Sequence, residues 1–323
     1  MASEVCGDAV PGRTVKLALI ALPAELRMYA RCIASIEGVR WIGYGGYACA
    51  YPHIDLSGRE GAEGCVRCYV SADAMMDVAD VVLVAGLEED RFRFVSSALR
   101  KGKHVWAIGP VCSTWEETAK LAALAQEAMV CNQAAHLARE SAVLKAAMGQ
   151  WDGVRLIRFE TACLISSPLN AEWERFLLFP AFDRLMALGD APLRKMKARS
   201  VSCMGIPQAG IVADLEFMSG MEAFLSLDRV AEKPASCLVA MSPEKSIRLD
   251  FLAGKAEWRG VLASAGGSRV VRNSLEVKPV RLLQQNIASF VRTVREGRHP
   301  SFGFLQSSEV QERFSQLKKL VYA

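Results

Sequence analysis

Residues 78–106 read VADVVLVAGLEEDRFRFVSSALRKGKHVW, and this stretch decides the fold. It begins with an apolar run at 80–86 that ends at a glycine, continues with a helical segment at 89–101, and returns to an apolar run at 103–109. Strands that are apolar throughout and are separated by a helix indicate a parallel sheet covered on both faces. The stretch therefore predicts a strand–helix–strand unit of an α/β domain.

The same alternation of strands and helices extends over residues 15–135, which we expect to form a doubly wound parallel sheet. Within it Thr114 is a good helix N-cap, and Thr114 with Glu117 forms a capping box ahead of an apolar stripe. The second half of the chain has longer strands of period-2 alternation, which indicate an open mixed or antiparallel sheet with one exposed face. We therefore predict a flexible tail at 1–14, an α/β domain at 15–135 and an α+β domain at 136–323.

The composition excludes several partners. The net charge is +4, from 39 basic and 35 acidic residues that are spread evenly, which argues against nucleic acid or an anionic membrane as the partner. No apolar run approaches the roughly 20 residues that are needed to span a bilayer. The first residues contain acidic side chains and no continuous apolar stretch, so we expect no secretory signal and a cytoplasmic protein.

The cysteines raise the question of a metal site. Cys65 and Cys68 form a lone Cys-x-x-Cys, and Cys49 and His53 lie a short distance upstream, so four zinc ligands are conceivable. The spacing matches no common zinc module, and the other cysteines mostly lie in apolar segments, as small core residues of a reducing compartment do. We expect structural cysteines and no metal.

Three further segments accompany residues 78–106 in a definite order: STWEETAKLAALAQEA at 113–128, ALGDAP at 187–192 and FVRTVREGRHPSF at 290–302. Together the four extend over nearly the whole chain and resemble the glucose–fructose oxidoreductase / inositol dehydrogenase / MocA (Gfo/Idh/MocA) family of NAD(P)-dependent oxidoreductases. The resemblance implies a Rossmann-like domain followed by an α+β domain with an open sheet. It also implies assembly with another subunit through that sheet.

The chain departs from the family at the cofactor site. Where the family has Gly-x-Gly-x-x-Gly after the first strand, this chain has Ala21, Pro23 and Leu26. We expect the side chains of Leu22, Pro23 and Leu26 to occupy the space of a diphosphate, and Leu26 to push the helix off the sheet. The second strand ends in glycines and offers no carboxylate to a ribose. The positions that match the family's cofactor site are Leu22, Pro23, Ala24, Gly86, Gly109 and Pro110.

The catalytic positions are altered as well. The family's Glu-Lys-Pro corresponds to Ile108, Gly109 and Pro110, so only the proline remains. The family's acid/base histidine falls in the segment FLLFPAFDRLMALG at 176–189, where Phe179, Pro180 or Ala181 replaces it. Asp183 is the candidate for a surviving catalytic carboxylate, one residue out of register. NAD(P) is therefore expected to bind weakly or not at all.

Other polar residues follow the sixth and fourth predicted strands. Asn132, Gln133, His136 and Arg139 could line a ligand cleft at the carboxyl edge of the sheet, or could form a polar connector between the domains. The charge run at 88–91, which includes Arg91, is interpreted as capping and solvating the start of a helix.

Three hypotheses remain open at this point. The first is a protein with the family's fold that has lost hydride transfer and acts as a binding, regulatory or partner subunit, with a small ligand in the cleft. The second is an NAD(P)-dependent oxidoreductase of a sugar-like or other small substrate with an atypical cofactor loop. The third is an enzyme of another type. In each case we expect self-association through the C-terminal sheet, or a complex with an active partner enzyme.

Overall fold

The computed structural model describes residues 14–47, 67–164, 173–203, 205–264, 267–277 and 281–322. The tail at 1–13, Cys49, His53 and Cys65 lie outside the described residues. The chain forms two compact units, residues 1–137 with 281–312 and residues 138–280 with 313–323. Residues 281–312 group with the first unit, and residues 313–323 with the second.

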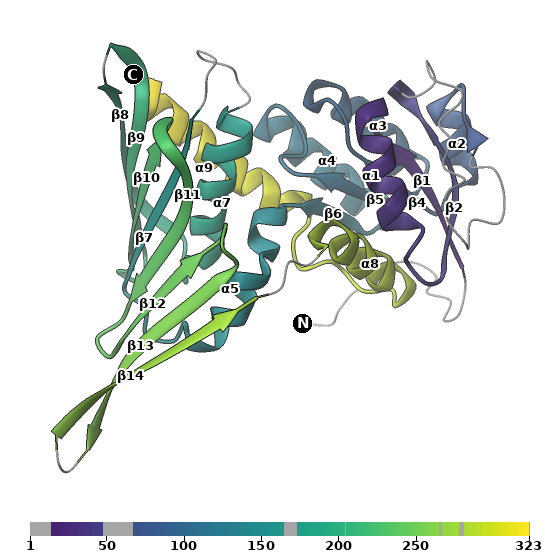
Figure 1. Ribbon diagram of the computed structural model, residues 1–323. Helices are drawn as coiled ribbons and strands as arrows, with labels where there is room; N and C mark the ends of the chain where they lie inside the picture. Colours follow the sequence, from purple (N-terminus) through teal and green to yellow (C-terminus); the bar gives the residue numbers. More distant parts are fainter. Residues whose placement is uncertain are drawn as a thin grey trace. The chain divides into compact units, whose positions relative to one another are not determined.

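The first unit contains a parallel sheet with the strand order β3-β2-β1-β4-β5-β6 (Figure 1). The strands are β1 (Val15–Ile20), β2 (Val39–Gly45), β3 (Arg67–Cys68), β4 (Val81–Val84), β5 (His104–Ile108) and β6 (Asn132–Ala135). The helices are α1 (Pro23–Ile33), α2 (Ala72–Val78), α3 (Glu88–Arg100), α4 (Trp115–Glu127), α8 (Leu282–Arg295) and the first part of α9 (Phe304–Tyr322). This is the doubly wound arrangement that the apolar strands predict.

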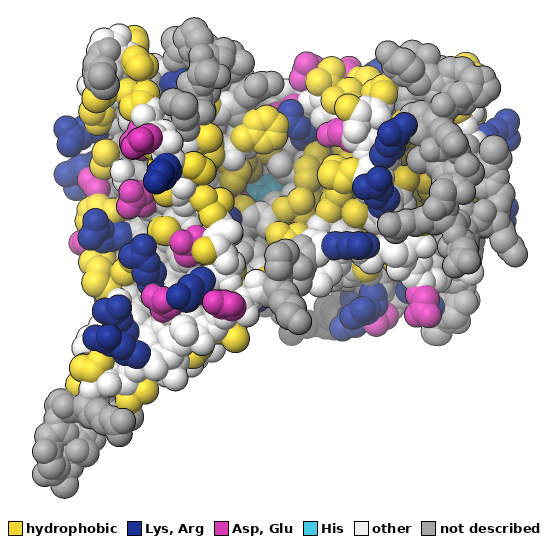
Figure 2. Space-filling model, viewed as in Figure 1, with side chains coloured by type: hydrophobic (Ala, Val, Ile, Leu, Met, Phe, Trp, Pro, Cys, Tyr) yellow, Lys and Arg dark blue, Asp and Glu magenta, His cyan; other side chains and the backbone are white. Residues whose placement is uncertain are grey.

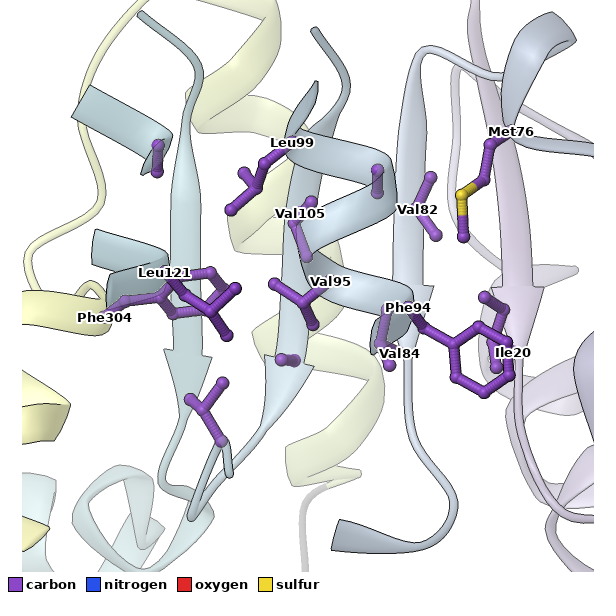
Figure 3. Close-up of a cluster of buried hydrophobic side chains, with 14 of the residues drawn as sticks. Ile20, Met76, Val82, Val84, Phe94, Val95, Leu99, Val105, Leu121 and Phe304 are labelled. Atoms are coloured by element: carbon purple, nitrogen blue, oxygen red, sulfur yellow. The ribbon is translucent and has the colours of Figure 1, made fainter. Parts of the chain in front are cut away.

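Each face of the parallel sheet is covered by its own hydrophobic core. One core joins the sheet to α1 and α8, and the other joins it to α2, α3 and α4. In the second core, side chains of β4 and β5 face Phe94, Val95 and Leu99 of α3 (Figure 3). The predicted cap is confirmed, because the Thr114 side chain accepts a hydrogen bond from the Glu117 amide at 3.2 Å.

The second unit contains a mixed sheet with the strand order β14-β13-β12-β11-β7-β10-β9-β8. The strands are β7 (Leu156–Leu164), β8 (Leu193–Cys203), β9 (Ile206–Phe217), β10 (Glu222–Asp228), β11 (Val230–Met241), β12 (Lys245–Asp250), β13 (Lys255–Ser264) and β14 (Gly267–Glu276). β7 and β10 run parallel and the other neighbours antiparallel. The helical segments are η2 (Leu137–Glu140), α5 (Ala142–Ala147), η3 (Met148–Gln150), a π-helix (Glu174–Leu178), α7 (Phe179–Leu188) and the end of α9.

The outward face of this mixed sheet carries both apolar and polar side chains. Phe217 and Met221 are buried, so they belong to the inner face, whereas Met218 and Val261 are exposed. Charged side chains of both signs are interspersed with apolar ones over the strands of this unit (Figure 2). Any self-association through the sheet would therefore use a mixed surface and not a continuous apolar one. Among the described residues, none of the helices combines the length and apolarity needed to cross a membrane.

Candidate functional site

The carboxyl edge of the parallel sheet is where a doubly wound fold binds ligands. β2 lies on one side of β1 and β4 on the other, so the strand order reverses direction between β1 and β4. Ligands of such folds occupy the crevice outside the carboxyl ends of the strands at this switch point. The relevant residues are therefore those that follow β1, β2, β4, β5 and β6 within the first unit.

The turn after β1 is capped by its own carboxylate. Helix α1 begins at Pro23, and the Leu22 amide donates a hydrogen bond to Glu25 Oε2 at 3.1 Å. The Glu25 amide in turn donates to the Leu22 carbonyl at 2.9 Å. The amides of Leu22 and Glu25 therefore already have hydrogen-bond partners. Pro23 has no N–H, so it offers no donor to a phosphate. Glu25 places a negative charge where a diphosphate would approach the helix.

The Leu26 side chain does not lie at the carboxyl edge of the sheet. The prediction that it occupies the space of a diphosphate and pushes the helix off the sheet is therefore wrong. Its side chain is fully buried in the core that joins α1 to the sheet and α8. The helix therefore accommodates the leucine as a core residue. Leu22 and Pro23 are partly exposed and Ala24 is exposed, so these three residues form the surface of the turn.

Tyr47 covers the ends of neighbouring strands. A Cβ on Gly86, which follows β4, would lie 2.7 Å from Tyr47 Cε2, so the ring rests directly on that glycine. The ring also makes an edge contact with Phe94 at 5.6 Å between centroids, and its hydroxyl donates to Asp90 Oδ2 at 2.6 Å. Burial and this hydrogen bond raise the pKa of Tyr47. Gly46 lies against Ile20, the last residue of β1.

Arg91 is fully buried, contrary to the interpretation of residues 88–91 as a solvated charge run. Its guanidinium donates to the Gly86 carbonyl at 2.8 and 3.2 Å, to the Ile108 carbonyl at 3.2 Å and to the Pro110 carbonyl. It thereby joins the segments that follow β4 and β5. The sequence pattern gave no sign of this role, because a charge at the start of a helix is ordinarily solvated.

His136 lies against Gly109. A Cβ on Gly109 would be 2.5 Å from His136 Nε2 and closer still to Cδ2. The imidazole is almost fully buried, its Nε2 is 2.9 Å from Ser307 Oγ, and its ring packs on Phe302 at 4.7 Å between centroids. His136 therefore fills the space that a side chain at position 109 would need.

The other cleft candidates are not gathered at this edge. Asn132 is the first residue of β6, at the amino end of the strand, and its Oδ1 accepts from the Phe304 amide at 2.7 Å. Gln133 donates to Asn286 Oδ1 at 2.9 Å. Asn132 is therefore a structural cap for α9 and not part of the carboxyl edge, which corrects its assignment to the cleft.

Arg139 and Asp183 form a buried ion pair within the second unit. Asp183 Oδ1 accepts from Arg139 Nε at 2.7 Å and from Nη2 at 2.6 Å. The Asp183 side chain is 1% exposed and that of Arg139 is 18% exposed. A charge buried this deeply needs a partner, so the pair has a structural role that is sufficient to explain the carboxylate. Phe179 and Ala181, which stand at the expected histidine positions, are buried as well.

Within the described ranges, the histidines and cysteines form no metal-binding group. His104 Nδ1 accepts a hydrogen bond from the Cys131 amide at 3.0 Å, and burial lowers the pKa of His104. Cys112 is buried, which raises its pKa to about 12 and makes it a poor nucleophile. Cys68 is partly exposed, but the proposed companion ligands fall outside the described residues.

Comparisons with known proteins identify the fold. No family model matches the chain, and no curated protein sequence matches it. Among solved structures, UDP-N-acetylglucosamine 3-dehydrogenase GnnA from Acidithiobacillus ferrooxidans is similar with a TM-score of 0.78 at 17% identity, over 95% of this chain and 97% of that one. A dehydrogenase from Chromobacterium violaceum gives 0.77 at 16% identity, over 96% of each chain.

A third similar structure is levoglucosan dehydrogenase in complex with NADH and levoglucosan. It has a TM-score of 0.75 at 13% identity and covers 95% of this chain and 97% of its own. These identities are too low to transfer an activity, but the likeness extends over both units of the chain. The chain therefore has the fold of the Gfo/Idh/MocA-type dehydrogenases, as its sequence segments predict.

Proposed function

We propose that the chain keeps this dehydrogenase fold without nicotinamide-dependent hydride transfer, and that it acts as a binding, regulatory or partner protein. One observation carries the proposal: side chains of the protein itself occupy the carboxyl edge of the parallel sheet. Glu25 caps the turn after β1, Tyr47 rests on Gly86, and His136 rests on Gly109.

Electrostatics at the first turn argue against a diphosphate. The amino end of α1 would favour an anion by about 0.3–1 kcal/mol. A phosphate charge about 4 Å from the Glu25 carboxylate would be repelled by roughly 1–4 kcal/mol, depending on solvent exposure. Moving backbone to make room beside Leu22 and Pro23 would cost about 1–3 kcal/mol more. The unfavourable contributions exceed the favourable one.

The positions that match the family's catalytic lysine and histidine supply no proton donor. Gly109 has no side chain, and Phe179, Pro180 and Ala181 carry no titratable group. The Asp183 carboxylate is held by Arg139 at 2.6 Å in a buried ion pair, so its charge is used within the fold.

The second candidate is an NAD(P)-dependent oxidoreductase of a sugar-like or other small substrate, and the comparisons favour it. Each of the similar structures described above is a dehydrogenase, and one of them binds NADH. This function would require Glu25 and Tyr47 to move when the cofactor binds. The proposed loss of hydride transfer is supported by the sequence and by the geometry of the site, and not by the comparisons.

Titration with NADH and NADPH separates the two candidates. We expect dissociation constants above about 1 mM, which corresponds to a binding free energy weaker than about −4 kcal/mol. Glu25→Gln should bind somewhat more tightly than the wild type, because the carboxylate charge is removed and the helix remains. A low-micromolar dissociation constant of the wild type for either nucleotide, measured by fluorescence, would establish the oxidoreductase instead.

For the partner, we propose a second copy of this chain, seated on the outward face of the mixed sheet. Phe224 and Val261 are apolar side chains exposed on strands of this sheet. Opposite charges also neighbour each other there, for example Lys197 beside Asp214 and Arg248 beside Glu257 in the strand register. A monomer by light scattering at micromolar concentration would contradict this proposal and favour a complex with a different, active enzyme.

A further inference from the structure

A second cluster of polar groups lies in the second unit, and no step of the proposed function uses it. Arg229 lies between β10 and β11 and is only 5% exposed. Its Nη1 donates to the Gln208 carbonyl at 3.2 Å, and its guanidinium lies over the Trp173 ring at 4.5 Å. Its Nε is buried and has no hydrogen-bond partner in the described part of the chain.

The acidic side chains near Arg229 in the described part of the chain have other partners. None of the ion pairs between described residues includes it. The carboxylate of Glu174, the residue after Trp173, is already bound by the Tyr322 hydroxyl and by Lys318 Nζ at 3.3 Å. Asp228, the residue before Arg229, uses its Oδ1 to accept from the Val230 amide at 2.8 Å.

The Gln208 side chain supplies a hydrogen-bond acceptor near the Arg229 guanidinium. Its side-chain Oε1 is buried and has no hydrogen-bond partner among the described residues. Its backbone φ is +53°, in the left-handed region that residues other than glycine rarely adopt. The Gln208 carbonyl binds Arg229, so the two side chains come from neighbouring backbone segments.

Arg229 is a buried cation without an ion pair among the described residues, and the buried Gln208 acceptor lies beside it. This combination favours a ligand of particular chemistry. A buried cation is costly unless a charge compensates it, and the face of Trp173 compensates it only in part. A water molecule could complete the hydrogen bonds but would leave the charge unbalanced. An oxyanion accepts from Nε and Nη of arginine together, in the fork geometry that suits carboxylate and phosphate.

We propose that Arg229 binds the oxyanion of a small ligand, a carboxylate or a phosphate group, and that a neighbouring hydroxyl of the ligand donates to Gln208 Oε1. Lys318 and Tyr322, on the last turns of α9, both contact Glu174, the residue after Trp173, and supply the exposed rim of the site. Arg229 lies over Trp173, and the next residue, Glu174, is bound by both rim side chains, so Arg229 lies close to this rim. The inference does not depend on whether the chain binds nicotinamide.

The test is a thermal-shift and calorimetric titration of the full chain with four probes at constant ionic strength: acetate, glycolate, inorganic phosphate and chloride. Glycolate differs from acetate by one hydroxyl, so the pair reports on Gln208. We expect saturable stabilisation by phosphate or by glycolate beyond that by chloride. Whichever of the two binds more tightly identifies the source of the oxyanion, and glycolate should bind more tightly than acetate.

Three variants connect the binding to Arg229. Arg229→Gln and Arg229→Lys should raise the dissociation constant roughly tenfold or more, because the charged fork is lost or replaced by a point charge. Arg100→Gln removes one positive charge from an exposed position at the end of α3 in the first unit and should bind like the wild type. If Arg229→Gln does not fold, Arg229→Lys carries the comparison. Equal binding by the wild type and both Arg229 variants would overturn the proposal, and so would a wild-type response to phosphate and glycolate no larger than the response to chloride. Equal binding of acetate and glycolate would remove Gln208 from the proposed site.

Discussion

Gly109→Ala tests whether the protein's own histidine closes the edge of the parallel sheet. The added methyl would lie 2.5 Å from His136 Nε2 and closer still to Cδ2, which is closer than real Cβ atoms come to their neighbours. The backbone of Gly109 is not in the left-handed region, so alanine adds a steric conflict and little backbone strain. The imidazole is confined by Ser307 and Phe302 and has little freedom to move aside.

The expected cost follows from these contacts. Overpacking a buried site costs about 1–3 kcal/mol, and losing the hydrogen bond to Ser307 costs about 1 kcal/mol more, so the free energy of unfolding should fall by roughly 2–4 kcal/mol. Urea unfolding followed by tryptophan fluorescence measures the change. Hydrogen exchange of the peptides around β5 and β6 shows where the structure loosens.

Two controls make the result specific. Gly149→Ala places a methyl where nothing lies within 4 Å, so it should change the stability by less than about 0.5 kcal/mol. His136→Ala removes the ring, and in that background Gly109→Ala should cost at least about 1 kcal/mol less than in the wild type. A Gly109→Ala cost below about 0.5 kcal/mol, or an equal cost in both backgrounds, would refute the reasoning.

Three other predictions concern residues that the structure assigns to folding. Asp183→Ala removes a buried carboxylate and its two hydrogen bonds to Arg139, so the free energy of unfolding should fall by roughly 3–5 kcal/mol. Replacing both residues by leucine should cost much less, as urea unfolding would show. His104 has a folded pKa below its unfolded value, so its contribution to stability is present above about pH 6.5 and is lost as the pH falls through the folded pKa. Urea unfolding at pH 7.5 and pH 5 should show this loss, and His104→Gln should lessen it. Tyr47→Phe removes the hydrogen bond to Asp90 and keeps the ring on Gly86, so thermal unfolding should show a loss of about 0.5–1.5 kcal/mol.

The fold could be predicted from local patterns, because burial on both faces of a sheet leaves strands that are apolar throughout. Residues 78–106 gave β4, α3 and β5 in this way, and Thr114 marked the start of α4. The alternation in the second half likewise predicted strands with one buried and one exposed face, as in β10.

The contents of the candidate site could be predicted only in part. The sequence identified the altered positions at Pro23 and Gly109 but not the side chains that lie against them. Tyr47 meets Gly86, and Arg91 meets the carbonyls after β4 and β5, through contacts between distant segments. Such contacts depend on where the ends of strands fall in space, and no periodicity or spacing in one sequence records them.

The departures from the family's motifs are coupled to the side chains that lie against them. A lysine at position 109, as the family has, would collide with His136, because even a methyl there lies within 2.5 Å of the ring. Glycine in place of Pro23 would restore an amide but would leave the Glu25 carboxylate bound to the Leu22 amide. Restoring one family residue at a time would therefore lower stability or leave the edge occupied. The several departures are better explained as one rearranged edge than as independent losses.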